Sequence, residues 1–156
     1  MRRKKVINKK VRNATPLTYN GIAFKSKLEV YCYKKLKETG IDFTYEGVTF
    51  ELMPSFTFDN NSYELYRKNG EKYFGPQRHH IRTITYTPDF VGNGWVIETK
   101  GNPNESFPMK WKMFKHYLQL NDSNVDLFVP RNQKQIDEVI NIIKTKHEGI
   151  LSSKKD

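Results

Sequence analysis

Apolar side chains first recur along the chain with the period of a helix. After Ser26 they fall every three or four residues, at Leu28, Tyr31, Cys32 and Leu36. Residues at this spacing share one face of a helix. Ser26 and Glu29 match a capping box at the start of the segment, and Gly40 is a typical residue to stop it. We therefore predict a helix between Ser26 and Gly40, with Glu29 on the buried face.

The period then changes to that of a β-strand. From Ile41 to Leu52 apolar residues alternate, but their parity changes at Glu46-Gly47, which predicts one strand with a bulge or bend there. Residues 53–80 mix aromatic, basic and turn-like residues, and we expect them to form an insertion. Two interpretations of this insertion remain. It is either a small β-hairpin subdomain packed on its own aromatics or a surface that stacks on unpaired or branched DNA.

Residues 85–101 contain two β-rich runs on either side of Asn93-Gly94. This dipeptide is typical of a two-residue type I′ turn, in which both central residues have positive φ. Counting outward from such a turn gives the pairs Gly92–Trp95, Val91–Val96, Phe90–Ile97 and Asp89–Glu98. Lys100 would share the face of the two carboxylates. A three-residue turn would instead place Asp89 opposite Ile97 and separate the acids.

The last third of the chain alternates between helix and strand. Pro108 can open a helix that runs to about Leu120, residues 125–129 form a short apolar run, and a final helix is expected over 132–146. A strand, helix, strand crossover is right-handed and sets its two strands parallel. These patterns predict a fold of α-helices and β-strands (α/β in the broad sense, of the α+β type) with a mixed sheet. It forms one domain over residues 21–150. We expect a disordered tail at 151–156.

Composition favours a polyanionic partner. The chain has 27 Lys and Arg against 17 Asp and Glu, a formal net charge of +10, and nucleic acid is the first candidate for such a surface. Residues 1–20 look like a flexible basic arm, which either lies along phosphates or is a solvated tail. Its basic residues are Arg2, Arg3, Lys4, Lys5, Lys9, Lys10 and Arg12.

Several features bear on where the protein acts. Cys32 is the single cysteine, which excludes an intramolecular disulfide and fits a reducing compartment. No apolar run approaches the roughly 20 residues that a membrane span requires, and the basic start is not followed by the apolar region of a signal peptide. We expect a soluble, intracellular protein with no membrane partner.

The pair Asp89 and Glu98 suggests a metal site. Side chains opposite each other on a sheet stand about 5 Å apart, and two carboxylates at that distance repel each other unless a cation lies between them. Oxygen ligands suit Mg²⁺ or Mn²⁺. Lys100 would then orient a metal-bound water or hold a phosphate oxygen, as in hydrolysis of a phosphodiester. Alternatively, these residues are ordinary polar positions on the solvated face of a hairpin.

The same residues carry a resemblance to a known family. Pro88-Asp89, followed after eight residues by Glu98-Thr99-Lys100, resembles the signature of the PD-(D/E)XK nuclease superfamily. The longer run from Tyr86 to Phe90 with Glu98 to Gly101 resembles the endonuclease I family of podophages, small enzymes that resolve Holliday junctions and other branched DNA. The resemblance implies a restriction-endonuclease-like core with the order α-β-β-β-α-β-α.

The resemblance also implies roles for individual residues. Glu29 would be the third metal-site carboxylate, the backbone carbonyl of Thr99 would help to hold Mg²⁺, for which Mn²⁺ substitutes, and Lys100 would position the nucleophile. The family works as an intertwined homodimer, and a phage-encoded member acts in the cytoplasm of the host cell. Where the family tends to carry a further acid this chain has Thr44, although Glu46 lies two positions on.

Other parts of the chain leave the function open. Lys110 and Lys112 begin the helix that follows Lys100, so they are either DNA-backbone contacts near the metal site or solvated surface lysines. Another PD-(D/E)XK role, such as restriction, nicking or transposon-end cleavage, would need a sequence-reading element, and no zinc finger or helix-turn-helix is recognisable. The alternative from a different class is a non-catalytic nucleic-acid-binding or virion-associated protein.

Overall fold

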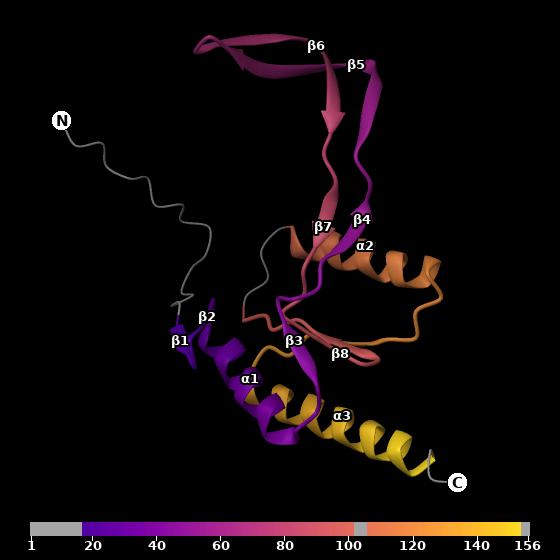
Figure 1. Ribbon diagram of the computed structural model, residues 1–156. Helices are drawn as coiled ribbons and strands as arrows, with labels where there is room; N and C mark the ends of the chain where they lie inside the picture. The colour runs from indigo at the N-terminus through magenta and orange to yellow at the C-terminus, as the bar shows by residue number, and fades with distance from the viewer. Residues whose placement is uncertain (1–16, 102–105, 154–156) are drawn as a thin grey trace, which may run out of the picture. The chain divides into compact units, whose positions relative to one another are not determined.

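The computed structural model describes residues 17–101 and 106–153, and its contacts divide the chain into two units (Figure 1). The first, which we call the core unit, comprises residues 1–48 and 87–156. The second, the hairpin unit, is the internal segment Thr49–Tyr86, which is wider than the insertion expected at 53–80. The seven basic residues of the expected arm, Arg2 to Arg12, lie outside the described residues.

The core unit is a mixed α+β assembly. Its elements are β1 (Leu17–Tyr19), β2 (Ile22–Phe24), α1 (Lys27–Thr39), β3 (Phe43–Tyr45), β8 (Phe90–Gly92), β9 (Trp95–Ile97), α2 (Phe107–Leu120), β10 (Asp126–Phe128) and α3 (Gln133–Ser153). β1 lies inside the stretch expected to be a flexible arm, residues 1–20, and pairs antiparallel with β2, so the ordered part of the chain begins earlier than expected. A four-stranded sheet has the order β10-β9-β8-β3. β10 runs parallel to β9, as the crossover predicts, and the other pairs are antiparallel.

The hairpin of β8 and β9 has the predicted register but not the predicted turn. Phe90 pairs with Ile97, Val91 with Val96 and Gly92 with Trp95. Of the two turn residues, Gly94 has a φ of 79° whereas Asn93 is not among the residues with positive φ. The turn therefore resembles type II, in which only the second central residue needs positive φ, and the type I′ prediction is wrong.

A layer of apolar side chains joins the helices to this sheet. Cys32 and Leu36 on α1 and Ile136 on α3 are each 0% exposed, as are Phe90 and Ile97 of the hairpin. α1 and α3 pack against each other (Figure 1). The capped helix between Ser26 and Gly40 forms as predicted, because its apolar stripe is the face that this layer buries.

The final helix is longer than predicted. α3 continues through Gly149 to Ser153, so the expected end before Gly149 and the expected disorder from residue 151 are wrong for this stretch. Gly149 destabilises a helix by only about 1 kcal/mol relative to Ala, which is too little to stop one. No helix among the described residues has both the length and the apolar character needed to cross a membrane.

The hairpin unit consists of two antiparallel strand pairs. β4 (Phe50–Met53) pairs with β7 (Ile84–Tyr86), and β5 (Phe56–Lys68) pairs with β6 (Glu71–Ile81). The single strand predicted over residues 41–52 is therefore wrong: β3 and β4 belong to different sheets, separated at Glu46, whose φ is 47°. The segment forms a β-hairpin, one of the two interpretations, but several of its aromatics are exposed rather than packed together.

A first prediction concerns Gly92, whose cross-strand partner Trp95 lies over it. A Cβ atom at this position would lie 2.2 Å from Trp95 Cε2 and Cζ2, and the ring is only 5% exposed. We expect Gly92→Ala to displace the ring and lower the free energy of unfolding by about 1–3 kcal/mol, the usual cost of overpacking. Urea unfolding measures this, with Gly75→Ala as control because no atom lies within 4 Å of its added Cβ. Equal stability of the two variants would contradict the packing.

Candidate functional site

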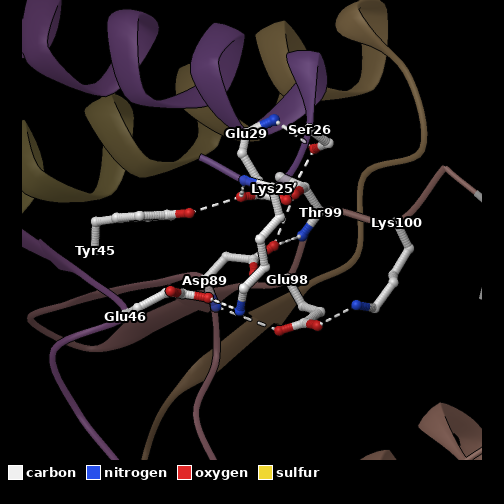
Figure 2. A network of polar contacts seen from close by, with 9 residues as sticks. All are labelled: Lys25, Ser26, Glu29, Tyr45, Glu46, Asp89, Glu98, Thr99 and Lys100. Carbon is white, nitrogen blue, oxygen red and sulfur yellow. Dashed lines mark hydrogen bonds and ion pairs between the residues drawn. The ribbon is translucent and has the colours of Figure 1, made fainter. Parts of the chain in front are cut away.

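The ends of β8 and β9 bring two acids together in the core unit (Figure 2). Phe90 and Ile97 are the pair of the hairpin farthest from the turn, and Asp89 and Glu98 are the next residues beyond them. Asp89 is 7% exposed and Glu98 is 4% exposed. The Asp89 N–H donates to Glu98 Oε2 at 3.3 Å. Asp89 Oδ2 in turn accepts from the Thr99 N–H and the Thr99 hydroxyl, both at 2.7 Å. The predicted juxtaposition is confirmed, and burial of both acids excludes the interpretation as a solvated hairpin face.

The start of α1 supplies the third acid. Ser26 caps the helix by accepting from the Glu29 N–H at 3.2 Å, and its hydroxyl donates to Glu29 Oε1 at 2.9 Å. Glu29 Oε2 accepts from the Lys25 N–H at 2.9 Å and from the Tyr45 hydroxyl at 2.6 Å. This is a capping box in which the glutamate reaches the residue before the cap. Glu29 is thus both the cap partner and a buried carboxylate, 5% exposed.

The three carboxylates influence one another electrostatically. The pKa of Asp89 is raised to about 7, first by burial and then by the negative charges of Glu98 and Glu29, while the hydrogen bonds from Thr99 act in the opposite direction. Figure 2 shows the side chains of Glu29, Asp89 and Glu98 gathered between α1 and the ends of the two strands. A cation would favour the charged form of Asp89, since it offsets both the desolvation and the repulsion from its neighbours.

Lys100 provides a positive charge beside Glu98. Its Nζ lies 2.6 Å from Glu98 Oε1, and its backbone N–H donates to the Pro130 carbonyl at 3.0 Å. The ammonium also lies 5.1 Å from the centroid of the Phe107 ring, which stacks on Trp111. The start of α2 therefore helps to hold Lys100 on the side of the sheet that the alternation predicts.

The donor set fits a hard divalent cation in its chemistry. Carboxylate oxygens are the ligands that Mg²⁺ and Mn²⁺ prefer. In the part of the chain that the structure describes, no three His, Cys, Asp or Glu groups already stand arranged to hold an ion. Glu29 and Asp89 instead accept hydrogen bonds from Tyr45 and Thr99. Coordination would therefore require these oxygens to exchange hydrogen bonds for the metal.

Sequence reasoning missed two contributors to this site, Tyr45 and Lys25, and named a third, Glu46, only by its position near the place of the family's further acid. Tyr45 reads as an apolar strand position, and only its hydroxyl contact with Glu29 reveals a polar role. Lys25 forms an ion pair with Glu46, and this hydrogen bond, together with the charges of Asp89 and Glu29, raises the pKa of Lys25. The Glu46 N–H donates to the Asp89 carbonyl at 2.9 Å, so Glu46 lies beside Asp89 across the sheet. The parity change at Glu46 was the one signal available in the sequence.

The structure shows where the remaining predicted residues lie, and their roles stay predictions. Lys110 lies half-buried and Lys112 exposed on α2. Thr99 is 5% exposed and uses its N–H and hydroxyl for Asp89, and its carbonyl as a metal ligand stays a prediction. DNA contacts by the basic arm stay a prediction as well.

Comparison with known proteins identifies a family whose function is unknown. A family model described as "Protein of unknown function (DUF1064)" matches residues 8–129. The match covers most of the core unit and the whole hairpin unit, including Glu29, Asp89, Glu98 and Lys100. A search of curated proteins and a search of solved structures each found no match.

A second prediction links Asp89 to the pH dependence of stability. Folding raises its pKa from 3.8 to about 7, so between these values the folded chain binds more protons than the unfolded chain. Stability therefore falls as the pH rises through this window, and the full penalty is present above it. We expect urea unfolding in EDTA to show this decline, and Asp89→Asn to remove most of it because the amide carries no charge to bury.

The matched control is Asp42→Asn, since Asp42 is an exposed aspartate in the same unit. This variant should keep the decline of the unmodified protein. An equal decline in Asp89→Asn would show that the Asp89 carboxylate is not destabilised by the fold.

Proposed function

Because the chain belongs to the DUF1064 family of unknown function, we propose a function from the chemistry of the site. The protein is a divalent-metal-dependent endonuclease that hydrolyses phosphodiesters in branched DNA such as Holliday junctions. The observation that carries the proposal is the burial of Glu29, Asp89 and Glu98 near one another, with Lys100 bound to Glu98. Three buried acids cost folding free energy, and a divalent cation is the ligand that would recover it.

Each residue has a distinct role in this proposal. Glu29, Asp89, Glu98 and the carbonyl of Thr99 would hold Mg²⁺ or Mn²⁺, which lowers the pKa of a bound water and neutralises charge on the phosphate. Lys100, held by Glu98 and the Phe107 ring, would position the attacking water or a non-bridging phosphate oxygen. Until an ion binds, Tyr45 and Ser26 hold the Glu29 carboxylate in the site through their hydrogen bonds.

The arrangement of the core unit supports the resemblance to PD-(D/E)XK nucleases. After the β1-β2 hairpin its elements run α1, β3, β8, β9, α2, β10 and α3, and we propose that they correspond to the order α-β-β-β-α-β-α of that core. The hairpin unit is inserted between β3 and β8. One acid, Glu29, lies on the first helix, and Asp89 and Glu98 directly flank the central hairpin, which favours the proposed correspondence with the motif.

Substrate and assembly follow from charge and from the resemblance. The net charge of +10 favours a nucleic acid, and the run from Tyr86 to Gly101 resembles enzymes of branched DNA. Two symmetric cuts across a four-way junction need two sites, so we propose a homodimer, which is intertwined in the family resembled. A phage-encoded protein of this kind acts in the host cytoplasm.

A third prediction tests the reaction. Purified protein is incubated with a labelled four-way junction and with a linear duplex of the same sequence, in Mg²⁺, in Mn²⁺ or in EDTA. We expect cleavage of the junction alone, lost in EDTA and in Asp89→Asn, because the site needs both the ion and the charge of Asp89. Binding without cleavage in every metal would contradict catalysis, and site-specific cleavage of the duplex would contradict the choice of substrate.

A fourth prediction separates the chemical role of Lys100 from DNA binding. Lys100→Met should lower kcat by about 100-fold or more, in the range for loss of a group that acts on the reacting atoms, while junction affinity in Ca²⁺ stays unchanged. Lys134→Met, which removes an exposed lysine on α3, is the control and should leave kcat unchanged. An equal loss of affinity and rate in Lys100→Met would make Lys100 a binding residue only.

A further inference from the structure

The pairing of β5 with β6 sorts the side chains of the hairpin onto two faces. Directly paired residues share a face, and residues two apart along a strand share it too. One face, which we call the aromatic face, carries the cross-strand pairs Tyr63–Pro76, Leu65–Phe74 and Arg67–Lys72. The opposite face carries Ser62–Gln77, Glu64–Gly75, Tyr66–Tyr73 and Lys68–Glu71. Figure 1 shows the two strands running side by side over this length.

The aromatic face exposes large apolar side chains. Tyr63 is 63% exposed, Leu65 is 64% exposed and Phe74 is 73% exposed. Exposed apolar residues that adjoin one another mark a binding surface more often than isolated ones do. A partner that covered them would remove apolar surface from water, which is favourable, so this face is a candidate binding surface.

The opposite face is satisfied by its own contacts. The Tyr66 and Tyr73 rings stack with centroids 5.7 Å apart, the Tyr73 hydroxyl donates to Glu71 at 2.6 Å, and the Ser62 hydroxyl donates to Glu64 at 2.5 Å. Both acids of residues 62–77 lie on this side. Between Tyr63 and Pro76 the aromatic face therefore has Arg67 and Lys72 and no acid, which makes it complementary to an anion.

We propose that the aromatic face binds unpaired nucleotides of a DNA strand. Tyr63 and Phe74 would stack on bases, and Arg67 and Lys72, at the end of the face nearest the turn, would contact phosphates. Proteins that bind single strands combine these two kinds of residue, because every base has a ring to stack and every linkage has a charge. The choice of DNA rests on the proposed nuclease function.

A second copy of the chain fits the face less well. Two aromatic faces laid against each other would bury Arg67 and Lys72 of both copies with no acid of either face to pair with them. Buried charges without a partner are strongly unfavourable. A nucleotide strand supplies bases that stack on the aromatic rings and phosphates that pair with Arg67 and Lys72. The hairpin unit thereby gains a role in selecting DNA with unpaired bases over continuous duplex.

Fluorescence anisotropy with the full-length chain tests the proposal. Asp89→Asn is the background for every variant, in EDTA, and the probe is a labelled thymidine oligomer containing one 2-aminopurine. Phe74→Ala should weaken binding by about 5- to 100-fold, the range for loss of one base stack, and should reduce quenching of the 2-aminopurine. Phe74→Tyr should restore both, since the ring is retained.

Arg67 and its neighbour Lys68 form a matched pair of charges on opposite faces. Arg67→Ala should make the slope of log affinity against log salt less negative by about 0.7, as expected for loss of one phosphate contact on a single strand. Lys68→Ala should leave the slope unchanged. Circular dichroism confirms that each variant is folded.

Unchanged affinity in Phe74→Ala would overturn the proposal, as would equal effects of Arg67→Ala and Lys68→Ala. A shift of Phe74→Ala from dimer to monomer by light scattering, with oligomer affinity retained, would overturn it in favour of a second copy. Junction cleavage by the unmodified protein is measured separately. If the oligomer stacks on the aromatic face but the junction is not cleaved, only the proposed nuclease function is overturned. If the junction is cleaved but the oligomer does not stack, only this inference is overturned.

Discussion

The structure depends on keeping three carboxylates buried close together. Glu29, Asp89 and Glu98 are each less than a tenth exposed, and burial together with the charges of Glu98 and Glu29 raises the pKa of Asp89. Proteins rarely bury acids in this way unless a positive charge or donors compensate them. The surrounding elements supply such compensation to each of the three acids.

Compensation comes from donors on three separate elements. The cap of α1 presents Ser26 and the Lys25 N–H to Glu29, the end of β9 presents Thr99 to Asp89, and β3 presents Tyr45 to Glu29. Lys100 neutralises Glu98 from one side. The site therefore needs the helix start, the central hairpin and β3 to be in place together, and the mixed sheet of the core unit holds them there.

Local patterns predicted the parts of the site that depend on short-range geometry. The turn length and the alternation of apolar residues determine the register of β8 and β9, so the pairing of Asp89 with Glu98 could be derived from the sequence. The turn type could not be derived, because Asn93 and Gly94 suit more than one turn. Tyr45 and Lys25 were missed because their contacts cross from one element to another, and no spacing in the chain encodes them.

Calorimetric titration of Mn²⁺ into the DNA-free protein tests the central claim most directly. The account predicts binding near neutral pH that releases protons to the buffer, because the raised pKa leaves part of Asp89 protonated until the ion displaces that proton. It also predicts that Glu29→Gln and Asp89→Asn each weaken binding, and that Asp89→Asn abolishes the proton release. Absence of binding, or binding that is unchanged in both variants, would contradict a metal site at these carboxylates.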